Sequence, residues 1–145
     1  MTEQTPRVRD AMIAEPRSLP ATATAREAGE VLTPAEVRAV YVVDDDGGLV
    51  GVVTRKTLVA RIVAAGLDPG TTPLGALAEP PYYTIDAETP LDEAFRFIEE
   101  NDAERVPVVD QGRLVGVVSR AVLQRRLAED EEPADADSAA GAEDP

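Results

Sequence analysis

The segment LVGVVTR at residues 49–55 returns as LVGVVSR at residues 114–120. The segment VVD at residues 42–44 returns in the same order at residues 108–110. The offset is 65 residues for the first pair and 66 for the second, because the turn that follows residue 44 has one extra residue. Several blocks in one order at a nearly constant offset indicate two copies of a single structural unit.

Each copy begins with the same pattern of predicted elements. A short extended piece follows a proline, at residues 18–19 in copy one and at residues 84–85 in copy two. A helix comes next, and copy two shows it best, because Leu91, Ala94 and Ile98 fall on one face at helical spacing.

Each copy then has two β-branched runs joined by a turn rich in Asp and Gly. They predict antiparallel hairpins at residues 40–53 and 106–118. A final helix follows each hairpin and begins at Thr54 or Ser119, whose hydroxyls suit a helix N-cap.

These patterns predict an α/β (α+β) fold of two tandem β-α-β-β-α units related by a pseudo-two-fold axis. A unit of about 65 residues buries too little surface to be stable alone, so the two units should pack together. The predicted bounds are residues 7–65 for the first domain, 66–73 for a linker, 74–127 for the second domain and 128–145 for a disordered acidic tail. One helical turn near residues 74–78 matches residues 8–12 and is expected to lead into copy two.

The net charge of −14 is unevenly distributed. Residues 128–145 contain eight acidic side chains and no basic one, which predicts disorder. The rest of the chain has 20 acidic and 14 basic side chains, and that excess of negative charge argues against nucleic acid as a partner.

The chain contains neither His nor Cys, which excludes imidazole bases, thiolate nucleophiles and the usual zinc sites. We therefore expect no catalytic residues, no metal site and no enzyme activity. No run approaches the length of a transmembrane helix, and the first ten residues do not look like a signal peptide. A cytoplasmic protein with no membrane partner is the expectation.

The order of elements resembles that of the cystathionine-β-synthase (CBS) domain, over residues 7–127. The motif RVPVVD at residues 105–110 and the two GVV-Thr/Ser-Arg blocks carry the resemblance. Two such domains form a Bateman module, which implies a stand-alone regulatory pair. The resemblance also implies an adenine nucleotide or related ligand between the copies, and a homodimer shaped like a flat disc. In ligand-binding members an Asp holds the ribose, but here Thr57 and Val122 occupy those positions.

The candidate ligand-binding residues lie near the ends of the predicted strands and at the starts of the final helices. They are Ser18, Val40, Thr54, Arg55, Tyr82, Tyr83, Thr84, Arg105, Val106, Pro107, Ser119 and Arg120. A helix N-terminus favours an anion, which the adjacent Arg would reinforce. Copy two has Arg105 where copy one has Ala39, so the cleft served by Ser119 and Arg120 is expected to bind more tightly than its mate.

Two interpretations of function remain open. The first is a regulatory module that senses a small anionic ligand, such as an adenine nucleotide, and modulates an unknown protein partner. The second is a ligand-free interaction protein that keeps the fold, since the ribose-holding Asp is missing from both copies. Both interpretations include a homodimer, because apolar faces on the final helices need partners.

Overall fold

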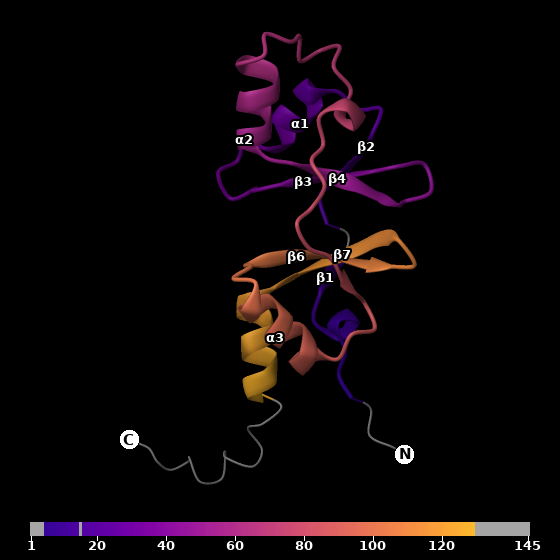
Figure 1. The fold of residues 1–145 in the computed structure, drawn as a ribbon, viewed down its shortest axis with the longest axis vertical. Coiled ribbons are helices and arrows are strands. Elements are labelled where there is room, and N and C mark those ends of the chain that lie inside the picture. The colour runs from indigo at the N-terminus through magenta and orange to yellow at the C-terminus, as the bar shows by residue number, and fades with distance from the viewer. Residues whose placement is uncertain (1–4, 15, 130–145) are drawn as a thin grey trace.

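The computed structural model describes residues 5–14 and 16–129. Two units are stacked along the long axis of the molecule, with their sheets facing each other at the middle and their helices on the outer sides (Figure 1). The predicted α+β fold of two similar units is confirmed. Among the described residues, no helix combines the length and apolarity needed to cross a membrane.

The unit built mainly from copy one has a three-stranded sheet in the order β2-β3-β4. Strands β2 and β3 are parallel, whereas β3 and β4 form an antiparallel hairpin. Its elements are β2 (Ser18–Pro20), α1 (Ala25–Val31), β3 (Val40–Val43), β4 (Leu49–Val53), α2 (Arg55–Leu58) and the π-helical turn η2 (Val59–Val63).

The unit built mainly from copy two repeats this plan. Its elements are β5 (Ile85–Asp86), α3 (Leu91–Glu100), β6 (Arg105–Asp110), β7 (Arg113–Ser119) and a helix over residues 120–129. Both predicted hairpins are therefore confirmed. The final helix includes residues 128 and 129, although the sequence pattern places them in the disordered tail, so that boundary is displaced by two residues. The prediction for the rest of the tail lies outside the described residues.

The segment that precedes each copy joins the sheet of the other copy. Strand β1 (Ile13–Ala14) pairs with β7, which makes the second sheet four-stranded in the order β1-β7-β6-β5. Glu79, the counterpart of Ile13, pairs with Val52 of β4 through backbone hydrogen bonds of 2.9 and 3.0 Å. The two leading segments have thus been exchanged.

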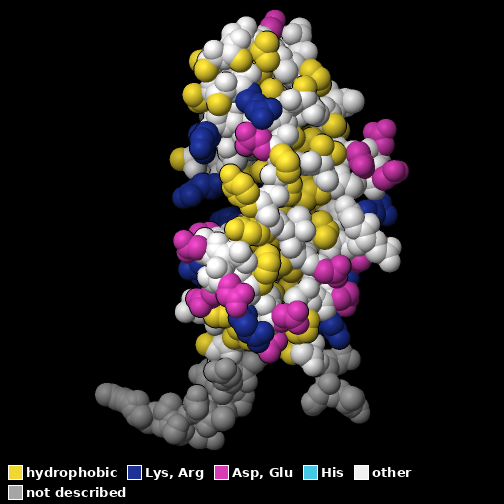
Figure 2. Space-filling view, viewed as in Figure 1, with side chains coloured by type: hydrophobic (Ala, Val, Ile, Leu, Met, Phe, Trp, Pro, Cys, Tyr) yellow, Lys and Arg dark blue, Asp and Glu magenta, His cyan; other side chains and the backbone are white. Residues whose placement is uncertain are grey.

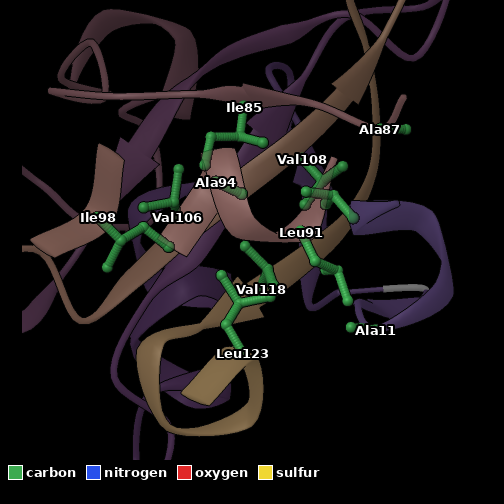
Figure 3. Close-up of a cluster of buried hydrophobic side chains, with 11 residues drawn as sticks. Ala11, Ile85, Ala87, Leu91, Ala94, Ile98, Val106, Val108, Val118 and Leu123 are labelled. Atoms are coloured by element: carbon green, nitrogen blue, oxygen red, sulfur yellow. The ribbon is translucent and has the colours of Figure 1, made fainter. Parts of the chain in front are cut away.

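The cores show the same exchange. Val8, from the 3-10 turn η1 (Val8–Asp10), is fully buried in the core that α3 and β6 cover, and Ala11 follows it there (Figure 3). Leu74, from the 3-10 turn η3 (Leu74–Ala76), is fully buried in the core beneath α1 and β3. We therefore distinguish unit one, residues 16–79, from unit two, residues 5–14 and 80–129.

This exchange corrects the predicted roles of the leading segments. The bounds 7–65 and 74–127 follow the sequence repeat, but each repeat begins with a turn that belongs to the core of the other unit. The turn near residues 74–78 packs in the core of unit one before the chain continues into copy two. The physical reason is that a short amphipathic turn packs wherever an apolar face is open, and repeat order alone does not say which face that is.

The repeated glycine in the GVV block is required by the exchanged segments. A Cβ on Gly51 would lie 2.7 Å from the carbonyl oxygen of Glu79, and one on Gly116 would lie 2.9 Å from that of Ile13. Real Cβ contacts are not that short. Glycine at both positions therefore lets the backbone from the other copy approach the sheet closely.

The hairpin turns also join the units in a reciprocal way. The N–H of Leu49 donates to the carbonyl of Gly112 at 3.2 Å, and the N–H of Leu114 donates to the carbonyl of Gly47 at 3.0 Å. Donor and acceptor occupy equivalent positions in the two copies. This pair of hydrogen bonds is what a pseudo-two-fold relation between the units requires.

Candidate functional site: two clefts between the units

Two clefts of similar size lie where the units meet, and equivalent positions of the two copies line them. The first cleft has a volume of about 360 Å³ and the second about 380 Å³. The first is lined by Ile13, Pro16, Arg17, Glu36, Val37, Arg38, Ala39, Tyr41, Arg105 and Val117. The second is lined by Tyr41, Val52, Pro81, Tyr82, Tyr83, Asn101, Asp102, Ala103, Glu104, Arg105 and Pro107.

The first cleft is basic. Arg17 precedes β2, Arg38 precedes β3, and Arg105 begins β6, so both units contribute a guanidinium. Glu36 is the one carboxylate among these lining residues. Figure 2 shows Lys and Arg side chains on the left of the molecule, at the level where the units meet. A cation-rich hollow in a chain of net charge −14 is suited to an anionic ligand.

The second cleft has the opposite charge balance. Glu104 stands at the position equivalent to Arg38, and Asp102 at the position equivalent to Glu36. Arg105 also lines this cleft, together with those two carboxylates. A phosphate group would therefore be repelled more strongly in the second cleft than in the first.

Tyr41 and Arg105 line both clefts. Tyr41 is in the middle of unit one's sheet, opposite Val52 of β4. Burial raises the pKa of the Tyr41 hydroxyl above its ordinary value, and the positive charge of Arg105 partly opposes that rise. The tyrosine therefore stays a neutral hydrogen-bonding group at neutral pH.

The two adjacent tyrosines of the second cleft have different surroundings. Tyr83 packs edge-on against Phe97 with ring centroids 5.6 Å apart, and it covers the edge of unit two's core. Tyr82 is 95% exposed, with its ring 6.3 Å from that of Tyr83. Only Tyr82 offers a free aromatic face for stacking.

The predicted site residues are only partly brought together. Arg105 lines both clefts, and Tyr82, Tyr83 and Pro107 line the second. The remaining eight predicted residues, Ser18, Val40, Thr54, Arg55, Thr84, Val106, Ser119 and Arg120, line neither cleft. For the valines the reason is plain, because Val40 and Val106 are fully buried in the separate cores of the two units.

The two hydroxyls predicted as helix caps do cap their helices. Thr54 Oγ1 accepts from the N–H of Thr57 at 3.3 Å, and Ser119 Oγ accepts from the N–H of Val122 at 3.2 Å. Thr57 returns a bond, since its own Oγ1 accepts from the N–H of Thr54 at 3.0 Å. Thr57 is only 2% exposed, so the position expected to hold a ribose is occupied by a buried group that completes the cap.

The arginine that follows each cap anchors a loop. Arg55 donates to the carbonyls of Leu32 and Pro34, at 2.5 and 2.8 Å, where α1 ends. Arg120 donates to Asp102 at 3.2 Å and lies 4.0 Å from a carboxylate oxygen of Glu104. Both loops continue into the cleft linings, so these arginines act on the clefts through the backbone and through neighbouring carboxylates. These contacts account for an arginine at the start of each helix without a bound anion.

Sequence reasoning had not selected Arg17, Arg38 and Tyr41. Arg17 and Arg38 do carry a signal, because each stands just before a strand that opens at the junction. This signal is weak beside that of Arg105, which by itself favours copy two as the better binder. Arg105 lines both clefts, so the difference in charge between the clefts comes from Arg38 in the first and Glu104 in the second.

This architecture, with paired units and clefts between them, is that of a tandem CBS pair. A family model for the CBS domain matches residues 8–64 and 74–129, and the chain belongs to this family. Hypoxic response protein 1 from Mycobacterium tuberculosis is 36% identical over 106 residues, which cover 73% of this chain and 74% of that protein.

Two solved structures extend the comparison. Hypoxic Response Protein I with two coordinated zinc ions has a TM-score of 0.69 at 33% identity, covering 83% of this chain and 98% of that one. CBSX2 in complex with AMP has a TM-score of 0.68 at 26% identity, covering 86% and 98%. The zinc ions are a feature of the first of these proteins. The present sequence has neither His nor Cys, and its described residues contain no cluster of three or more carboxylates placed to hold a metal.

Proposed function

We propose that this CBS pair is a regulatory module that binds a small phosphate-bearing ligand, an adenine nucleotide or a close relative, in the first cleft. The observation that carries the proposal is the convergence of Arg17, Arg38 and Arg105 on one hollow between the units. Because both units contribute to this cleft, a ligand there contacts both at once. It can therefore change how they sit together, and an unknown protein partner would respond to that change.

The walls of the first cleft support a ligand that also has a flat apolar part. Ile13 and Val117 lie opposite each other in the β1–β7 pair and both line the cleft, together with Val37. A purine needs such aliphatic surfaces, and a phosphate needs the guanidinium groups. The AMP complex of CBSX2 supports this class of ligand.

A second candidate function is a ligand-free interaction protein. One observation favours it: Thr57 stands where the family's ribose-holding Asp would be, and its hydroxyl is already used in the cap of α2. In the first proposal, affinity therefore comes mainly from the phosphates. In the second, the basic cleft is a surface feature with no ligand.

Calorimetric titration with AMP, ADP and ATP separates the two functions. Arg38→Ala should weaken binding at least about tenfold, since a charge-assisted hydrogen bond contributes roughly 1.5–3 kcal/mol. The matched control is Glu104→Ala, the equivalent position in the second cleft, which should change affinity less than about twofold. Equal losses in the two variants would contradict the assignment of the ligand to the first cleft, and no binding to the parent protein would favour the interaction-protein function.

Glu36→Gln gives an independent check on the same cleft. It removes the one carboxylate among the lining residues, so binding of a phosphate should tighten about two- to fivefold at low salt. Weaker binding would mean that Glu36 accepts hydrogen bonds from the ligand, and the phosphate-dominated proposal would then be wrong.

A further inference from the structure

Tyr41 and Arg105 line both clefts, so they form the wall where the clefts meet. Tyr41 comes from β3 of unit one, and Arg105 begins β6 of unit two. Pro107, the counterpart of Tyr41 in the repeat, lines the second cleft but not the first. Ala39, the counterpart of Arg105, lines the first cleft but not the second. The wall therefore has one cation for two clefts, and it breaks the pseudo-two-fold symmetry.

The two clefts depend on this cation to different degrees. The first cleft has two further arginines, Arg17 and Arg38. Among the residues that line the second cleft, Arg105 is the one cation, and Asp102 and Glu104 are the carboxylates. An anion in the second cleft therefore needs Arg105, because that lining offers it no other guanidinium.

The Arg105 guanidinium has no fixed partner in the part of the chain that the structure describes. Within residues 5–14 and 16–129, it forms no ion pair within 4.0 Å and no side-chain hydrogen bond. The neighbouring carboxylates pair with another arginine, since Arg120 donates to Asp102 and lies 4.0 Å from an oxygen of Glu104. Arg105 is therefore available to an anion in either cleft.

We propose that Arg105 makes anion binding in the two clefts mutually exclusive, so that one chain holds one phosphate-bearing ligand at a time. An anion in the first cleft engages this guanidinium and leaves the second cleft with no lining cation, and Asp102 and Glu104 then repel a second anion. By linkage, an anion in the second cleft draws the same group away and weakens binding in the first. The inference rests on the proposed phosphate binding and deepens it, because it makes the second cleft an antagonist site for small anions.

The repeat shows what independent clefts would need. If position 39 held an arginine, as position 105 does, each cleft would have its own guanidinium at the wall. Because Ala39 stands there instead, two sites share one group. Ala39 is half-buried and directly precedes β3, so a longer side chain at this position can extend into the first cleft that it lines.

Calorimetric stoichiometry with inorganic pyrophosphate at low ionic strength tests the exclusion. Pyrophosphate needs the guanidinium groups but not the apolar walls, so it reports on the charges alone. The starting variant is Glu104→Arg, which gives the second cleft the arginine that Arg38 gives to the first. This variant should still bind one pyrophosphate per chain, with any second binding at least about tenfold weaker. Two equal, independent sites in it would overturn the proposal.

A second wall cation should remove the exclusion. Adding Ala39→Arg to Glu104→Arg should raise the stoichiometry to two pyrophosphates per chain. The matched control adds Ala39→Gln instead, a long side chain without charge, and should stay at one. Circular dichroism checks that each variant is folded. A stoichiometry of one with Ala39→Arg, or of two with Ala39→Gln, would contradict the role given to Arg105.

Removing the shared group gives a second measurement of the same coupling. In the Glu104→Arg background, Arg105→Gln should weaken both sites but abolish the difference between first and second binding. Exclusion that persists without Arg105 would have another cause, and the proposal would be wrong.

AMP titration of the parent protein distinguishes this inference from the proposed function. If pyrophosphate follows the stated stoichiometries but AMP does not bind, the nucleotide assignment is wrong and the exclusion stands. If AMP binds in the first cleft but Glu104→Arg takes up two pyrophosphates equally, the proposed function stands and the exclusion is wrong. If the parent binds neither AMP nor pyrophosphate, both proposals are wrong.

Discussion

Units one and two share one backbone plan but differ in charge and surface. Both hairpins have a register shift at the same place, between Val42 and Val43 in one and between Val108 and Val109 in the other. In contrast, the loops that lead into β3 and β6 have opposite charges, at Arg38 and Glu104. The repeat is therefore kept where the backbone needs a particular residue, and it has diverged where side chains face a cleft or solvent.

The largest expected loss of stability tests in which unit's core each leading segment packs. Leu74→Ala should lower the free energy of unfolding by about 2–5 kcal/mol, because the side chain is fully buried. Denaturant unfolding measures the loss. Val50→Ala, at a side chain that is 40% exposed, is the control and should cost less than about 0.5 kcal/mol.

NMR chemical shifts then show which unit each substitution perturbs. Leu74→Ala should perturb β3 and β4 of unit one, and Val8→Ala should perturb β6 and β7 of unit two. If each substitution instead disturbs mainly the unit that follows it in sequence, the exchange of leading segments would have to be abandoned.

A smaller effect compares the two anchoring arginines. Arg55→Ala removes hydrogen bonds to two carbonyl oxygens and should cost about 1.5–3 kcal/mol. Arg120→Ala should cost no more than about 1 kcal/mol, because its partners Asp102 and Glu104 are largely exposed and its Nε is buried without a hydrogen bond. Thermal unfolding of the two variants measures the difference, and equal losses would contradict it.

The smallest effect compares the two caps. Thr54→Ala breaks a reciprocal cap, and the free energy of unfolding should fall by about 1–2 kcal/mol. Ser119→Ala breaks a single hydrogen bond and should cost about 0.5–1 kcal/mol. Chemical denaturation of both variants gives the ranking, and a larger loss for Ser119→Ala would show that the Thr57 hydroxyl contributes little to the cap.

Local patterns predicted the elements of the fold well. Runs of β-branched residues joined by Asp- and Gly-rich turns predicted both hairpins, and helical spacing from Leu91 predicted α3, because these signals depend on neighbours within a few positions. The capping roles of Thr54 and Ser119 were predictable for the same reason. Each of these structures is determined largely within one repeat.

Interactions between the copies were much harder to predict. The cores that receive Val8 and Leu74 depend on packing between segments more than 70 residues apart or across the linker. The clefts combine side chains from both units, so Arg105 could not be assigned to one cleft from its repeat position. Arg55 begins one helix, whereas a carbonyl that accepts its hydrogen bond lies at the end of another helix.

The exchange of leading segments makes the two cores differ in the order in which they become complete during synthesis. The core of unit one runs without interruption from Ala23 to Leu77, so all of it has been synthesised before β5 and the rest of unit two leave the ribosome. The core of unit two takes Val8 from near the start and Leu123 from near the end, which gives it a high contact order. Vectorial folding should therefore proceed from unit one, while Val8 stays exposed until the helix that contains Leu123 has been synthesised.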